Sequence, residues 1–328
     1  SVPPEAVDQS SSHKREGAFY VWKDSEVSEL FGEHAEMVRL RYGIEAGGNA
    51  LEDPHGEFAN QNILYVGHGV DDVARLSGRP VEEVIAVLDT AKAKLFDARC
   101  RRPRPHLDDK VLAGWNGLMI AAFARAARVM QSSDSTELSL LETANRAAKF
   151  VRERLWDTER CVLYRRFREG HADIDGFAED YASVIWGLLE LFQAGGDPVW
   201  LDWAKQLQQT QNRLFWDDED GGWFNTTGTD PTVLLRLKDD YDGAEPSAGS
   251  VSVWNLSTLA HLSGPDEATG YRDLIDRTLY RVPASAQLAR VVPMMMAAAS
   301  TRESGLPQLI VVGPRGANST VALLRVFT

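Results

Sequence analysis

Residues 181–192 read YASVIWGLLELF, and Glu190 is the one charged residue among them. A helix that is apolar on every side must be buried on every side. The stretch therefore predicts an inner helix, packed among other helices. Segments 111–130 and 251–262 have the same character, and small residues such as Gly114 and Gly117 would let neighbouring backbones approach closely.

Amphipathic segments alternate with these apolar ones. In 81–96, Val84, Leu88 and Leu95 lie on one stripe while acidic and basic residues occupy the remaining positions. Segments 137–155 and 199–214 follow the same pattern, which is typical of a helix with one wet face. These three segments are predicted to be outer helices, and a further outer and inner pair is predicted at 267–280 and 285–299.

Two motifs recur along the chain and reveal its repeat. LFD at 95–97, LWD at 155–157 and FWD at 215–217 are spaced by 60 residues, and Asp108, Asp175 and Asp242 are spaced by 67. Each unit is a helix, a loop and a helix, so the fold class is mainly α, an (α/α) toroid of helical hairpins. We expect four hairpins, and a closed ring of six would need two more, from short helices near 24–42 and 70–77 or from sequence beyond the ends. Short strands are expected at 17–22, 62–66 and 309–314.

Composition narrows the class of protein. The 328 residues are 44% hydrophobic and 25% charged, as in globular domains, and the formal net charge is −13, which would repel nucleic acid. No apolar run reaches the roughly 18 residues that a membrane span needs. Cys100 and Cys161 form no CxxC or metal-ligand spacing, which favours a reducing compartment, the cytoplasm by default. No metal and no cofactor is predicted.

The domain organisation follows from the repeat. Residues 1–15 are rich in Ser and Pro and are predicted to be a flexible N-terminal segment. Residues 16–328 are predicted to be a single toroid domain. The chain begins without Met and stops within an apolar segment, so we expect it to be truncated at one or both ends.

Acidic residues gather where the inner helices are expected to begin. Because these helices start on the same side of the ring, their leading ends should surround one mouth. Carboxylates that face one another across a shielded cavity acquire different pKa values, as acid and base partners in sugar chemistry require. The candidate catalytic residues are Glu179, Asp180, Asp108, Asp109 and Asp240.

Other residues at the predicted mouth could bind a substrate. Flat rings could stack on sugars, and polar side chains could hold hydroxyl groups. The candidate substrate-binding residues are Arg104, His106, Lys110, Trp115, Asn116, Tyr181, Glu245, Ser247 and Trp254. Structural roles compete with these assignments. Asp108, Asp175 and Asp242 are placed to cap helix N-termini, and Arg104 and Lys110 could simply neutralise the acids.

Six motifs resemble one protein family over most of the chain. They are EGAFYVW at 16–22, DPHGEF at 53–58, RPHLDDK at 104–110, WNGLM at 115–119, DGFAEDY at 175–181 and DGAEPS at 242–247. Together they resemble the thioredoxin-domain-containing family of spermatogenesis-associated protein 20 and its YyaL-like bacterial relatives. The resemblance implies an N-terminal thioredoxin-like domain followed by a six-hairpin toroid similar to glycosidases and N-acylglucosamine 2-epimerase.

The chain departs from the family pattern in two ways. The thioredoxin-like domain and its paired cysteines lie outside this sequence, so no redox activity is carried over. The family usually reads PSGNS where residues 246–250 read PSAGS, which removes an amide from the predicted mouth.

Two functions of different classes remain open from the sequence. The first is a carbohydrate-active protein with a sugar in the central cavity. It is hydrolase-like or, less favoured, epimerase-like, because epimerase chemistry uses more histidines than the predicted mouth offers. The second is a non-catalytic toroid that binds a ligand or partner and works with the thioredoxin-like domain.

Overall fold

The computed structural model describes residues 17–50, 58–130, 135–239, 241–282, 290–305, 307, 309–314 and 317–326. The chain forms two compact units, Ser1–Asp108 and Asp109–Thr328. This differs from the single domain that we predicted over 16–328. The reason is that the helices before residue 100 bury their apolar faces on one another, in two clusters of their own.

The first unit contains four α-helices and one 3-10 turn in its described residues. These are α1 (Asp24–Phe31), η2 (Gly32–His34), α2 (Ala35–Tyr42), α3 (Val70–Ser77) and α4 (Val81–Cys100). One face of α4 is apolar, with Leu95 packed in a cluster around Val27 and Val38, and Val84 packed with Val73. Helix α4 was predicted to be an outer helix of the toroid, and the structure corrects this.

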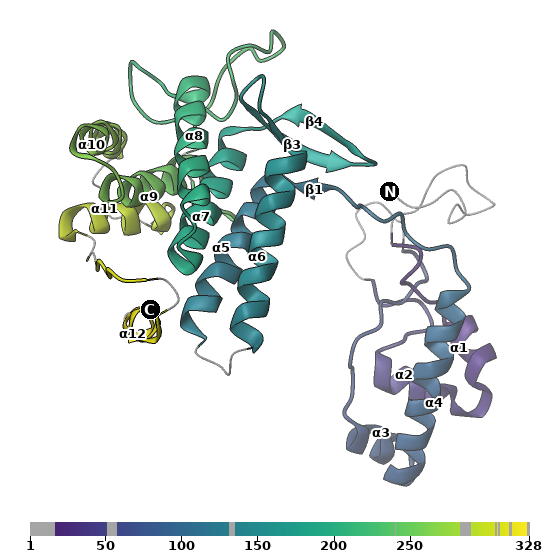
Figure 1. Cartoon of the computed structure of the whole chain (residues 1–328). Helices are drawn as coiled ribbons and strands as arrows, with labels where there is room; N and C mark the ends of the chain where they lie inside the picture. The colour runs from purple at the N-terminus through teal and green to yellow at the C-terminus, as the bar shows by residue number, and fades with distance from the viewer. Residues whose placement is uncertain are drawn as a thin grey trace. The chain divides into compact units, whose positions relative to one another are not determined.

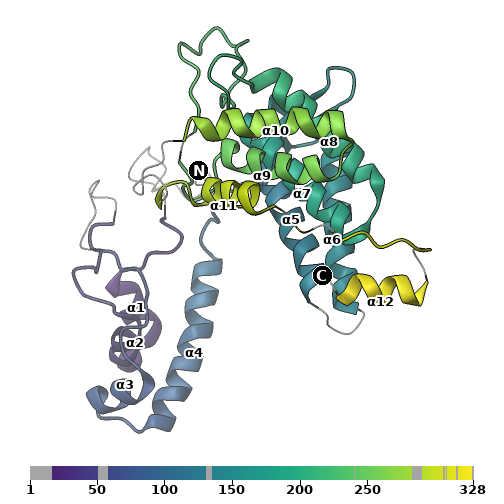
Figure 2. The ribbon, with the colours of Figure 1, turned by 90° about the vertical axis from the view of Figure 1, so that its left-hand side faces the viewer.

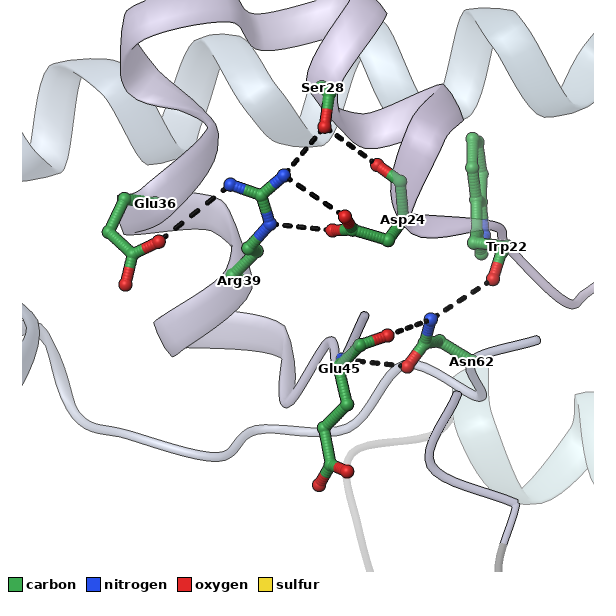
Figure 3. Close-up of polar contacts among 7 residues, drawn as sticks. All are labelled: Trp22, Asp24, Ser28, Glu36, Arg39, Glu45 and Asn62. Carbon is green, nitrogen blue, oxygen red and sulfur yellow. Dashed lines mark hydrogen bonds and ion pairs between the residues drawn. The ribbon is translucent and has the colours of Figure 1, made fainter. Parts of the chain in front are cut away.

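Polar contacts in the first unit join α1 to α2 and tie two loop segments together (Figure 3). Arg39 on α2 donates from Nε to Asp24 Oδ1 at 2.6 Å and from Nη2 to Ser28 Oγ at 2.6 Å, which ties α2 to α1. The buried Asn62 accepts the Glu45 N–H at 2.8 Å and donates to the Glu45 carbonyl at 3.0 Å. The predicted strands at 17–22 and 62–66 reduce to one isolated bridge between Trp22 and Asn62.

The second unit contains the repeated helices. They are α5 (Ala113–Val129), α6 (Ser135–Arg154), α7 (Ala178–Gly195), α8 (Pro198–Phe215), α9 (Ala248–His261), α10 (Pro265–Tyr280), α11 (Pro293–Ser304) and α12 (Asn318–Val326). The ends follow from local sequence: Asp197 accepts the Val199 N–H at 3.1 Å ahead of Pro198, and Gly196 ends α7 with φ 66°.

Packing separates these helices into an inner and an outer layer (Figures 1 and 2). Helices α5, α7, α9 and α11 contact one another in sequence, and α6, α8 and α10 each pack on an inner helix. Twelve residues of α7 are buried, as a helix enclosed on all sides requires. This arrangement confirms the predicted fold class, mainly α with hairpins of an (α/α) toroid. The described helices form an arc of it, because α4 lies in the other unit.

Strands occur where we predicted only loops. Strand β3 (Val162–Arg168) pairs antiparallel with β1 (Val111–Leu112), β2 (Trp156–Asp157) and β4 (His171–Asp175). Tyr164 lies opposite Asp175, and Val111 lies opposite Phe167. The hairpin brings β3 alongside the first turns of α5 and α7, where the candidate site lies. The predicted strand at 309–314 is irregular chain in the structure.

Among the helices that the structure describes, none is long and apolar enough to cross a membrane.

Candidate functional site

A cavity of about 370 Å³ lies where the inner helices of the second unit begin. Its walls come from the N-terminal parts of α5 and α7, from strand β3, and from the loop that precedes α9 and ends at Ser247. The predicted convergence of the inner helices' leading ends is therefore present. The residues with polar or aromatic side chains in these walls are Trp115, Arg165, Glu179, Asp180, Ser183, Asp239, Tyr241, Glu245 and Ser247.

Asp180 is the buried carboxylate of this cavity, with 3% of its surface exposed. It lies in the first turn of α7, where Oδ2 accepts the Phe177 N–H at 3.0 Å and Oδ1 accepts the Gly114 N–H of α5 at 3.2 Å. Burial raises the pKa of Asp180 to about 6. The hydrogen bond from the Phe177 amide and the charge of the Arg165 guanidinium lower this pKa, but by less than burial raises it. Asp180 thus joins the beginnings of two inner helices.

Arg165 links the two acidic residues of α7. Its Nη1 donates to Glu179 Oε1 at 2.7 Å and to Asp180 Oδ2 at 3.0 Å. The guanidinium lies over the Phe177 ring, 4.7 Å from its centroid, and this contact fixes its position further. The Glu179 side chain is 44% exposed, so of the two carboxylates it is the one open to a ligand.

The cavity wall also carries an exposed aromatic ring. Trp115, in the first turn of α5, is 58% exposed, and its Nε1 donates to Glu245 Oε1 at 2.7 Å. The bond holds the indole in one orientation and engages the Glu245 carboxylate. Tyr241, also exposed, lies in the same wall.

Five predicted site residues line this cavity, and others in the same unit do not. Glu179, Asp180, Trp115, Glu245 and Ser247 are in its walls. Their catalytic and binding roles stay predictions.

Three residues predicted to face the mouth are held elsewhere. Tyr181 is fully buried, and its hydroxyl accepts the Leu163 N–H at 2.7 Å; burial raises its pKa to about 12. Asn116 donates to the carbonyl of Leu112, the residue that precedes its helix, at 2.8 Å. Trp254 packs partly buried against the core. None of the three is among the described residues that line the cavity, because helical periodicity does not tell which face of a helix meets it.

The remaining candidates are not among the described residues that line the cavity. Asp109 pairs with Arg168 at 2.9 Å, and Lys110 is exposed; neither is among the described residues that line the cavity. Arg104, His106 and Asp108 belong to the first unit. Asp240 lies outside the described residues.

The predicted aspartate caps are also corrected. Helices α5, α7 and α9 are preceded by Leu112, Phe177 and Ser247, and only Ser247 among these caps through its side chain, accepting the Ser250 N–H at 3.2 Å. Asp242 is not the N-cap residue of α9, but it accepts the Ser247 N–H at 2.9 Å just before α9 and the Met294 N–H at 2.8 Å in the first turn of α11. Asp175 pairs with Arg160.

Sequence reasoning missed Arg165, and the one turn signal that the sequence offers for its hairpin is Gly170. Residues 162–168 and 171–175 are separated by Glu169 and Gly170, and both have positive φ, 53° and 85°. Two extended runs joined by two such residues form a tight hairpin. The hairpin would have placed a strand beside the cavity. In the described part of the chain, no group of three or more His, Cys, Asp or Glu residues is arranged to hold a metal ion.

Comparison with known proteins gives the relatives of this chain. It is 37% identical to human spermatogenesis-associated protein 20 over 348 aligned residues, which cover 98% of the chain and 42% of that protein. The predicted resemblance to the spermatogenesis-associated protein 20 family is confirmed. An uncharacterized protein of Caenorhabditis elegans, B0495.5, is 31% identical over 93% of the chain and 43% of its own length. The chain thus spans less than half of these relatives. No protein-family model matches it.

Solved structures similar to part of the chain include sugar epimerases and glycoside hydrolases. Cellobiose 2-epimerase from Bacillus thermoamylovorans has a TM-score of 0.45 at 18% identity, covering 56% of this chain and 48% of its own. A family 105 glycoside hydrolase of C. acetobutylicum has a TM-score of 0.42 at 9% identity, and the match covers 64% of this chain and 60% of the hydrolase.

Proposed function

We propose that the cavity of the second unit binds a sugar. One observation carries the proposal: an exposed indole, fixed by Glu245, shares a cavity of about 370 Å³ with the carboxylates of Glu179 and Asp180. The apolar face of a sugar ring stacks on a flat aromatic side chain, while its hydroxyl groups donate to carboxylates. The volume lies within the range of ordinary small-molecule sites.

We propose further that the bound sugar is cleaved, with Glu179 as the carboxyl group that reaches it. Glycoside hydrolysis uses two carboxyl groups that flank the scissile bond. Glu179 is open to the cavity, and Asp239 and Glu245 on other parts of the wall can provide the partner. Asp180 acts as a positioning residue, because its oxygens hold two backbone amides and Arg165. No histidine is among the described wall residues, which favours hydrolysis over epimerisation.

Substitution of Glu179 tests this proposal. A panel of mannose-, glucose- and glucuronate-containing oligosaccharides is incubated with the chain, and released reducing sugar is measured. Glu179→Gln keeps the size of the side chain and removes the ionisable group, and we expect turnover to fall at least a hundredfold. Glu159→Gln, at an exposed position outside the cavity walls, is the matched control and should leave turnover unchanged. Full turnover in folded Glu179→Gln would reject the assignment.

The second candidate function is sugar binding without turnover, for delivery to the thioredoxin-like domain that the family resemblance implies. The specific observation in its favour is that three cavity carboxylates already have partners: Glu179 and Asp180 share Arg165, and Glu245 holds Trp115. Calorimetry with the same panel separates the candidates. Binding that is lost in Trp115→Ala, with no product formed, supports the binding role.

A further inference from the structure

A second cavity, of about 330 Å³, lies next to the first in the same unit. The two share Asp239 and Ser247 as wall residues. Ser247 is buried at the beginning of α9, and Asp239 is exposed on the loop before it. A molecule that extends past these two residues would occupy both cavities.

The second cavity differs in chemistry from the first. Its walls include the buried side chains of Trp223, Val292 and Met295, whereas the first cavity is lined by carboxylates and an arginine. Two cations also border it, and both are already hydrogen-bonded. Lys238 donates to Asp217 and to the Gly221 carbonyl, and Arg281 donates to the same carbonyl at 3.0 Å. These walls suit an apolar group better than the hydroxyl groups of a second sugar.

Gly249 keeps this cavity open. It lies in the first turn of α9, and a Cβ added there would meet only Met295 Cε, at 3.9 Å. This is ordinary van der Waals contact, so a side chain at 249 would extend into the cavity and not into backbone. Cavities of about 150 Å³ with apolar walls already bind benzene, so the available space exceeds what one aromatic ring needs.

We propose that the second cavity is a subsite for an apolar substituent, of about the size of an aromatic ring, carried by the ligand of the first cavity. The assignment rests on the proposed sugar site, since it identifies the ligand as a glycoside with an apolar group attached to the sugar. Asp239 and Ser247 would then lie beside the bond between the two parts.

Paired ligands test the subsite. Methyl and phenyl glycosides of glucose, mannose and N-acetylglucosamine are titrated into the whole chain by calorimetry, together with phenol alone. We expect the phenyl glycoside of the preferred sugar to bind at least tenfold more tightly than its methyl counterpart. In Gly249→Leu this advantage should vanish while the affinity for the methyl glycoside is retained. Gly249→Ala is the matched control and should keep most of the advantage.

A second variant guards against misfolding. Val291→Phe fills the same cavity from a position that is 37% exposed, and thermal denaturation verifies that each variant is folded. Equal binding of methyl and phenyl glycosides would overturn the subsite and leave the sugar site standing. If no glycoside binds while phenol binds to the wild-type chain and not to Gly249→Leu, the sugar site fails and the apolar subsite stands. The subsite would also be overturned if phenyl glycosides bind no better than methyl glycosides and phenol does not distinguish the wild-type chain from Gly249→Leu.

Discussion

Asp180 is buried and inaccessible to a ligand, yet it positions the other groups of the site. Its two oxygens accept amides from the starts of α5 and α7 and also hold Arg165, which in turn holds Glu179. Its burial costs solvation of the charged form, and this cost appears as a pKa raised to about 6. The geometry of Glu179 therefore depends, through Arg165, on a buried neighbour with a raised pKa.

Asp180 should make stability depend on pH in an identifiable direction. Its pKa is about 6 in the folded chain against 3.8 as the ordinary value, so between these pH values the folded state binds more protons. Stability contributed by this group is therefore present at pH 4 and is lost as pH rises through 6. The full shift corresponds to roughly 3 kcal/mol. Urea denaturation of wild type and Asp180→Asn from pH 4 to pH 7.5 should show the wild-type free energy of unfolding declining relative to the variant.

A control of opposite sign is available in the same unit. The hydrogen bond from Arg166 lowers the pKa of the exposed Asp173 carboxyl. Asp173→Asn should therefore lose, relative to wild type, a contribution that is present above pH 4 and disappears on further acidification. A pH-independent difference for Asp180→Asn would contradict the raised pKa.

At this scale the sequence located part of the site. Glu179, Asp180, Trp115, Glu245 and Ser247 were predicted at the mouth because they lie in the first turns of inner helices or just before them, and they line the cavity. Periodicity could not show that the Tyr181 hydroxyl would be used to bind the Leu163 amide, since that partner comes from a strand 18 residues away in the sequence.

Among the elements, α5 and α7 make the closest approach. A Cβ added at Gly117 would lie 2.5 Å from the Ser183 backbone, and one at Gly187 would lie 2.6 Å from the Gly117 carbonyl. The two helices thus touch backbone to backbone beneath the cavity. This spacing fixes where Gly114 and Asp180 meet, so the packing of the elements sets the geometry of the site.

Gly117→Ala should separate these helices. The neighbour is backbone and cannot rotate away, so we expect the free energy of unfolding to fall by about 3 kcal/mol. The matched control is Gly249→Ala, the same substitution in α9, where the added Cβ has room. This control should be neutral or should stabilise by up to about 1 kcal/mol, because alanine favours helix. Equal effects in the two variants, measured by urea denaturation, would refute the close-contact argument.

The elements also show where sequence patterns fail. The outer helices α6 and α8 were predicted from their apolar stripes, and the inner helices α5, α7 and α9 from segments that are apolar on every side. Strand β3 has adjacent Arg165 and Arg166 in place of strict alternation, so its period was hidden. Missing the hairpin meant missing Arg165, the cation that joins the two acidic residues of the site.

For the whole molecule, helix type alone could not assign α4. Its apolar stripe fits an outer helix of a toroid as well as it fits the first unit, and only the tertiary contacts decide between them. The structure places Val84 and Leu88 with Met37 and Val73, far from the repeat in sequence. A regular spacing of 60 residues thus extended across a boundary between two units.

The two units should fold separately, because each has its own apolar clusters. We expect a fragment of residues 109–328 to unfold cooperatively in calorimetry, at a temperature close to one of the transitions of the whole chain. A fragment of residues 162–328 is the matched control. It lacks α5 and α6, which would expose the face of α7 that packs on α5, and it should not unfold cooperatively. A 109–328 fragment without a cooperative transition would show that the toroid arc needs the first unit.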